Sequence, residues 1–101
     1  QTREKVLIYL AARKQGYARE ISEFYNSSLS PVQIQLDRLE AGNVLVSHLS
    51  GRTRVYSFNP RYPFLEELLQ LLNKATSFLP EDKQENLLYN RKRPRRKDKP
   101  L

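Results

Sequence analysis

The clearest pattern of apolar and polar positions lies in residues 29–60, where a helical period gives way to two short runs of strand-forming residues. The apolar positions that recur at helical spacing are Val32, Leu36 and Leu39. Ser30 can cap the first free N–H groups of a helix and Pro31 suits its first position, so the pattern predicts a helix that starts here. Gly42 predicts where this helix ends.

Two runs rich in β-forming residues follow, at 44–49 and 55–58. The short connection between them contains Gly51, and such a connection is typical of a β-hairpin. Arg52 and Arg54 then lie at the hairpin tip. By position alone, these arginines fit solubility and edge protection as well as they fit ligand binding.

Helical patterns also cover residues 2–14, 18–25 and 64–79, and a shorter polar helix is expected over 81–90. A turn at 26–28 joins the second helix to the third. Two short helices joined by a tight turn form a helix-turn-helix unit, whose second helix enters the major groove of DNA. The sequence therefore predicts a mainly α fold with a small β-hairpin.

The helix expected over residues 64–79 carries an apolar arc that is broader than one small domain needs to cover. We interpret this helix as a dimerisation element, although an aliphatic arc is often only core. The candidate interface residues are Phe64, Leu65, Leu68, Leu69, Leu71, Leu72, Ala75 and Phe78.

The net charge of +7 is concentrated at the C-terminal end of this 101-residue chain. Residues 91–99 contain seven basic residues and one acidic residue, whereas residues 1–90 contain eleven basic and ten acidic residues. The basic residues of the tail are Arg91, Lys92, Arg93, Arg95, Arg96, Lys97 and Lys99. We expect residues 91–101 to be disordered when free and to bind any polyanion without reading sequence. A localisation or solubilising role for this tail stays open.

The composition gives little support to metal, redox or catalytic chemistry. The chain has no cysteine and one histidine, His48, so we expect no disulfide and no metal site. Because there is no Gly-rich phosphate loop and no acidic pair at a catalytic spacing, we expect neither an enzyme nor a cofactor. The absence of a long apolar run and of a secretory pattern predicts a cytoplasmic location without membrane contact.

The outward faces of the helix that follows Ser30 carry groups that can read bases. Gln33, Gln35 and Arg38 match base edges in a major groove, although such a face is often only solvated. Asp37 repels phosphate, and it could instead pair with Arg38 or accept a hydrogen bond from a cytosine amine. We favour the groove interpretation because a capped start, a short preceding helix and a basic hairpin occur together.

The start of the second helix is a further candidate for a backbone contact. Tyr17 and Arg19 lie there, and helix N-termini attract phosphate groups. Tyr17 could equally be a residue at the edge of the core.

The order of elements and three motifs resemble the winged helix-turn-helix transcriptional regulators of bacteria and archaea, nearest to the ArsR-like branch. The motifs are Arg19-Glu20-Ile21, Leu36-Asp37-Arg38-Leu39-Glu40-Ala41-Gly42 and Gly51-Arg52-Thr53-Arg54-Val55-Tyr56-Ser57-Phe58-Asn59-Pro60. The resemblance implies a winged helix-turn-helix DNA-binding domain at 1–60, a C-terminal helical dimerisation segment at 61–90 and a basic tail at 91–101.

The resemblance also implies a homodimer on a palindromic operator in double-stranded DNA. The residues near the DNA would be Gln33, Gln35, Asp37 and Arg38 in the groove, Ser27, Ser28 and Ser30 near phosphates, and Arg52, Thr53 and Arg54 in the wing. Metal-sensing members place cysteines on the recognition helix or His and carboxylate clusters on the last helix, and this chain departs from that pattern.

Two functional hypotheses follow. The first is a sequence-specific regulator of transcription, acting as a dimeric repressor. The alternative is a winged-helix module for protein–protein interaction, in which only the basic tail binds nucleic acid. The near balance of charge in residues 1–90 and the acid at position 37 favour this alternative.

Overall fold

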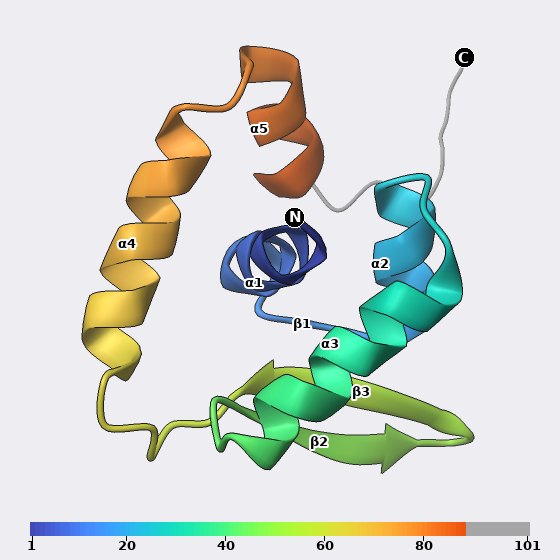
Figure 1. The fold of residues 1–101 in the computed structure, drawn as a ribbon. Coiled ribbons are helices and arrows are strands. Elements are labelled where there is room, and N and C mark those ends of the chain that lie inside the picture. The colour runs from blue at the N-terminus through green and yellow to red at the C-terminus, as the bar shows by residue number, and fades with distance from the viewer. Residues whose placement is uncertain (89–101) are drawn as a thin grey trace.

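The computed structural model describes residues 1–88, which form five α-helices and one three-stranded antiparallel sheet (Figure 1). The elements are α1 (Thr2–Arg13), β1 (Gln15–Gly16), α2 (Ala18–Phe24), α3 (Leu29–Ala41), β2 (Leu45–Ser50), β3 (Thr53–Phe58), α4 (Leu65–Ser77) and α5 (Glu81–Leu88). The predicted mainly α fold with a small β-hairpin is confirmed. The basic residues expected at 91–99 and the last two residues of the helix expected over 81–90 lie outside the described residues.

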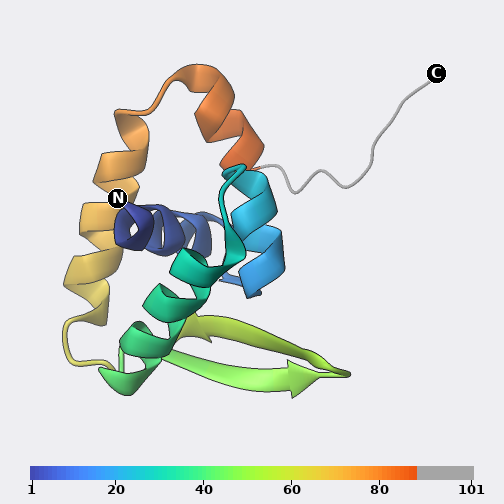
Figure 2. The same cartoon turned by 45° about the vertical axis from the view of Figure 1, so that its right-hand side comes forward.

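The first helix lies in the middle of the molecule. Helix α4 packs on one side of α1, whereas α2 and α3 lie on its other side. The sheet lies below the helices (Figures 1 and 2). Val6, Leu10 and Tyr9 of α1 are almost fully buried, and they join Ile21, Leu36 and other apolar residues in one core. The apolar period of α1 therefore positions the helix-turn-helix unit, α2 and α3, against the rest of the chain.

The sheet has the order β1-β3-β2, so the predicted hairpin gains a third strand. β1 has only two residues, Gln15 and Gly16, which pair with Ser57 and Tyr56. The first helix, predicted over residues 2–14, ends at Arg13, and Gly16 belongs to β1. The glycine serves close packing, since a Cβ atom there would lie 2.9 Å from Cε1 of Tyr9.

The third helix starts earlier than the sequence predicted. Its N-cap is Ser28, in an extended conformation, and Ser30 already lies in the first turn. Pro31 therefore occupies the third helical position rather than the first. All of the first N–H groups of a helix lack internal partners, so proline is tolerated in this turn and does not fix the starting residue.

The broad apolar arc predicted around α4 divides into two faces. Leu72 is only 6% exposed and belongs to the interior of its own chain, so it is removed from the predicted interface residues. Leu65, Leu68, Leu69 and Ala75 are partly buried. The most exposed apolar residues follow one line at seven-residue spacing, and they are Phe64 (63%), Leu71 (64%) and Phe78 (78%).

Candidate nucleic-acid interface

Two of the predicted base readers on α3 are bound to the sheet. The side-chain amide of Gln33 donates to the Tyr56 hydroxyl at 3.1 Å and to Oδ1 of Asp37 at 3.0 Å. The Tyr56 hydroxyl lies 3.4 Å from the same carboxylate oxygen, to which it donates. Gln33 and Asp37 thus connect α3 to β3, and we call these three side chains the Gln33–Tyr56–Asp37 cluster.

The ionisation of Tyr56 suits this arrangement. Its side chain is 2% exposed, and burial raises the pKa of the phenol above its ordinary value of 10.0. The nearby carboxylates of Asp37 and Glu40 raise this pKa further, although the Gln33 hydrogen bond lowers it. The hydroxyl therefore keeps its proton at neutral pH and remains a donor to Asp37.

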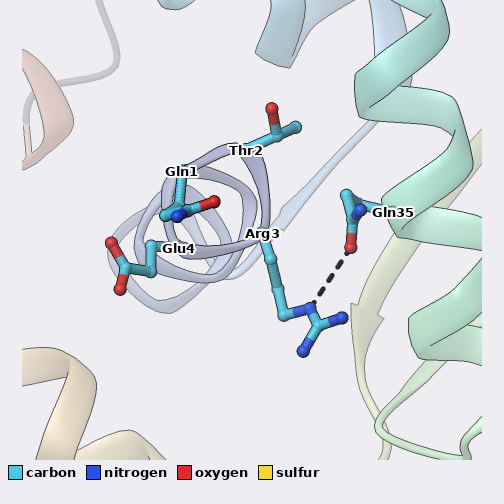
Figure 3. A pocket seen from close by; sticks show the side chains of 5 residues that line it. All are labelled: Gln1, Thr2, Arg3, Glu4 and Gln35. Atoms are coloured by element: carbon cyan, nitrogen blue, oxygen red, sulfur yellow. Dashed lines mark hydrogen bonds between the residues drawn. The ribbon is translucent and has the colours of Figure 1, made fainter.

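The second predicted amide, Gln35, faces the start of α1. Nε of Arg3 donates to Oε1 of Gln35 at 3.3 Å, as the dashed line in Figure 3 marks. These two residues line an open hollow of about 460 Å³ together with Gln1, Thr2 and Glu4. The amide of Gln35 is partly buried and is oriented by the first helix, so it does not lie on the outermost line of α3.

Other side chains form the outer face of α3. Ser30, Ile34 and Arg38 follow one another at four-residue spacing and are all exposed. The guanidinium of Arg38 has no hydrogen-bond or ion-pair partner among residues 1–88. Ile34 was not among the predicted site residues. The sequence does contain a signal for its exposure, because Ile34 lies two residues from both Val32 and Leu36 and so points away from the buried stripe.

The hairpin places its two arginines differently. Arg52 is exposed in the turn that contains Gly51, whose φ of +64° suits glycine. Nη1 of Arg54 instead donates to the Ser47 hydroxyl at 2.9 Å, and Ser47 donates to Oε2 of Glu40 at 2.7 Å. This chain of bonds joins both strands of the hairpin to the end of α3 and so fixes the hairpin relative to that helix.

The remaining predicted contacts lie at the surface near the helix-turn-helix unit. Tyr17 is the N-cap of α2 and is 37% exposed, and Arg19 is exposed in the first turn of the same helix. Ser27 and Ser28 are exposed in the turn before α3, and Thr53 in the wing is partly buried.

Acidic residues are unevenly distributed over the described chain. Residues 1–88 contain ten acidic residues, and five of them, Glu66, Glu67, Glu81, Asp82 and Glu85, belong to α4 and α5. These two helices lie away from the wing, beside and above α1 (Figure 1). The other five acidic residues include Asp37 and Glu40 of α3, so negative charge remains next to Arg38 and near the hairpin.

Within residues 1–88, no group of three or more His, Cys, Asp or Glu side chains is arranged to hold a metal ion. His48 is exposed on β2. None of the helices in this part of the chain has both the length and the apolar character needed to cross a membrane.

Comparisons with known proteins bear on the fold. No protein-family model and no curated protein matches the chain. Among solved structures, the YusO protein from Bacillus subtilis is similar, with a TM-score of 0.52 and 22% identity over 77% of this chain. The fold is a winged helix-turn-helix. This chain spans 64% of the YusO chain, and at this identity the likeness concerns the fold alone.

Proposed function

We propose that the chain is a sequence-specific DNA-binding regulator of transcription that places α3 in the major groove. The observation that carries the proposal is the exposed, unpaired guanidinium of Arg38 on the outer face of the second helix of a helix-turn-helix unit. A guanidinium in this position suits the O6 and N7 atoms of guanine. The hairpin beside it offers Arg52 to the phosphate backbone.

The polar residues near α3 then take different roles. Ser27, Ser28, Ser30 and Arg19 are exposed where phosphates would flank the helix. Gln33, Gln35 and Asp37 support the recognition helix through their internal hydrogen bonds, rather than reading bases as their primary role. Arg54 fixes the wing, and the other four N–H groups of its guanidinium can still reach a phosphate.

We further propose that the regulator is a homodimeric repressor that recognises a palindromic operator. The support is the line of Phe64, Leu71 and Phe78 on α4, which repeats every seven residues as in paired helices. Pairing of this line with its copy would bury three large side chains that a single chain leaves in water. Two recognition helices would then reach half-sites about 34 Å apart.

The dimer proposal has a matched pair of substitutions. Leu71→Lys should convert the dimer to a monomer, as measured by sedimentation. Because Leu71 is exposed in a single chain, the monomeric variant should remain folded and melt cooperatively. Leu72→Ala lies on the inner face and should instead lower the free energy of unfolding by about 2–4 kcal/mol. A Leu71→Lys variant that sediments like the unsubstituted chain would exclude α4 as the interface.

Selection from random duplex DNA tests the regulator proposal itself. We expect the full chain and a chain ending at residue 90 to enrich the same consensus, the shorter one with a weaker salt dependence. Arg38→Ala should weaken binding to the consensus more than to random DNA, whereas Arg52→Ala should weaken both equally. Enrichment of no sequence by either chain would contradict sequence-specific binding.

A second candidate function is a module for protein–protein interaction. It is favoured by the nearly balanced charge of residues 1–88 and by the exposed carboxylate of Asp37 on α3. It predicts that a chain ending at residue 90 loses all affinity for nucleic acid. The selection experiment therefore distinguishes the two candidates directly.

A further inference from the structure

An exposed branched aliphatic side chain lies at the centre of the outer face of α3. Ile34 is 47% exposed, and it lies between Ser30 and Arg38 on the line that points away from the core. Arg38 follows Ile34 by four positions, so the two residues are separated by a rise of about 6 Å along the helix axis.

The polar residues on either side of Ile34 are held by other parts of the molecule. Gln33 is bonded to Tyr56 and Asp37, and Gln35 is bonded to Arg3. On this face, the Ile34 methyl groups, the Arg38 guanidinium and the Ser30 hydroxyl make no hydrogen bond within residues 1–88, whereas Gln33 and Gln35 each have one side of the amide bonded.

Isolated apolar side chains are common on protein surfaces and need no function. Ile34 differs from an arbitrary surface residue because of its position beside an unpaired guanidinium on the recognition helix. Its β-branched side chain also has little rotational freedom in a helix, so contact with a ligand costs little conformational entropy.

We propose that Ile34 determines specificity by contacting the C5-methyl group of a thymine in the major groove. Thymine is the base that presents a methyl group there, and an aliphatic side chain distinguishes it by excluding water from that methyl group. This inference rests on the proposed function and adds the identity of a base to it. Because base pairs are spaced by about 3.4 Å, the thymine should lie about two steps from the guanine read by Arg38.

The experiment uses the full chain and its selected consensus duplex. Each thymine is replaced in turn by deoxyuridine, which removes the methyl group and preserves base pairing. At one thymine in each half-site, about two steps from a guanine, we expect the affinity to fall roughly fourfold to tenfold, as the loss of one buried methyl group implies.

Two variants then connect this loss to the side chain. Ile34→Ala should bind the thymine duplex as weakly as the unsubstituted chain binds the deoxyuridine duplex. The affinity of this variant should be the same for the deoxyuridine duplex as for the thymine duplex. Val46→Ala is the matched control, because Val46 is also a β-branched aliphatic residue, 39% exposed, but belongs to β2 and not to α3. This control should retain the full sensitivity to the methyl group.

The outcomes separate the two proposals. If a consensus is obtained but no deoxyuridine substitution weakens binding, or if Ile34→Ala stays as sensitive as the unsubstituted chain, the role of Ile34 is overturned while the regulator proposal stands. A consensus without a thymine at this spacing overturns it in the same way. If no consensus is enriched, both proposals fail.

Discussion

Replacing Tyr56 by phenylalanine removes the hydroxyl at the centre of the Gln33–Tyr56–Asp37 cluster and leaves the ring in place. Two hydrogen bonds are lost, the 3.1 Å bond from Gln33 and the 3.4 Å bond to Asp37. Gln33 and Asp37 keep their own bond of 3.0 Å. The ring stays 2% exposed, so we expect no cavity and no change in the core contacts of Tyr56.

The expected loss of stability follows from these distances. A neutral hydrogen bond contributes about 1 kcal/mol, and the longer bond to Asp37 contributes less because that carboxylate is exposed to water. Tyr56→Phe should therefore lower the free energy of unfolding by about 1–1.5 kcal/mol, and the melting temperature by roughly 4–8 °C per kcal/mol. Urea denaturation followed by circular dichroism measures both the midpoint and the slope.

Tyr62→Phe is the control, because Tyr62 is partly buried and its hydroxyl has no hydrogen-bond partner in the described part of the chain. That substitution should change stability by less than about 0.5 kcal/mol. Equal effects of the two substitutions would refute the argument that the cluster connects α3 to β3. A further expected result is weaker binding to the consensus duplex by Tyr56→Phe alone.

Four other predictions concern substitutions at Arg13, Gly16, Gly51 and Tyr25. Arg13 donates to two α5 carbonyl oxygens at 2.7 Å, so Arg13→Lys should accelerate amide exchange in α5 roughly 30-fold, for a loss of about 2 kcal/mol, and leave α3 unchanged. Gly16→Ala should lower stability by about 1–3 kcal/mol because its Cβ meets the buried ring of Tyr9. Gly51→Ala should lower the free energy of unfolding by about 1 kcal/mol through the positive φ of residue 51 alone. Asparagine tolerates this φ, so Gly51→Asn should be more stable than Gly51→Ala in urea denaturation. Gly16→Asn should bring no such gain over Gly16→Ala. Burial raises the pKa of Tyr25 from 10.0 to about 12. The stability present below pH 10 should therefore decline between pH 10 and 12. Tyr25→Phe should flatten this decline in urea titrations carried out across this pH range.

Much of this fold is predictable from the sequence because its signals are local. Helical periods with strong apolar stripes place α1, α3 and α4 within one or two residues of their observed bounds. The hairpin follows from two β-rich runs around Gly51. The short strand β1 has no such signal, since two residues cannot show a period, and its pairing depends on a partner about forty residues away.

The candidate site is less predictable, because its chemistry depends on contacts between distant residues. The sequence shows that Gln33, Gln35 and Asp37 are polar residues off the buried stripe, but it does not show that Tyr56 and Arg3 engage them. The same limitation applies to α4, where Leu71 and Leu72 are adjacent and chemically identical but lie on opposite faces. Only the position of α1 decides which leucine is interior.

The internal bonding of α3 also constrains how an operator could be bound tightly. A good bidentate contact to a base discriminates by about 1–3 kcal/mol, and the outer face offers one guanidinium and one apolar contact. Specific complexes with a Kd near 10⁻⁸ M require about 11 kcal/mol in total. In a single copy of the nearly neutral residues 1–88, α3 and Arg52 alone cannot supply this binding free energy. On the regulator and homodimer proposals, a second copy paired through α4 and the cationic residues at 91–99 supply most of the difference, beside the phosphate contacts proposed for Arg19 and Arg54. Loss of either should therefore weaken operator binding far more than loss of Arg52.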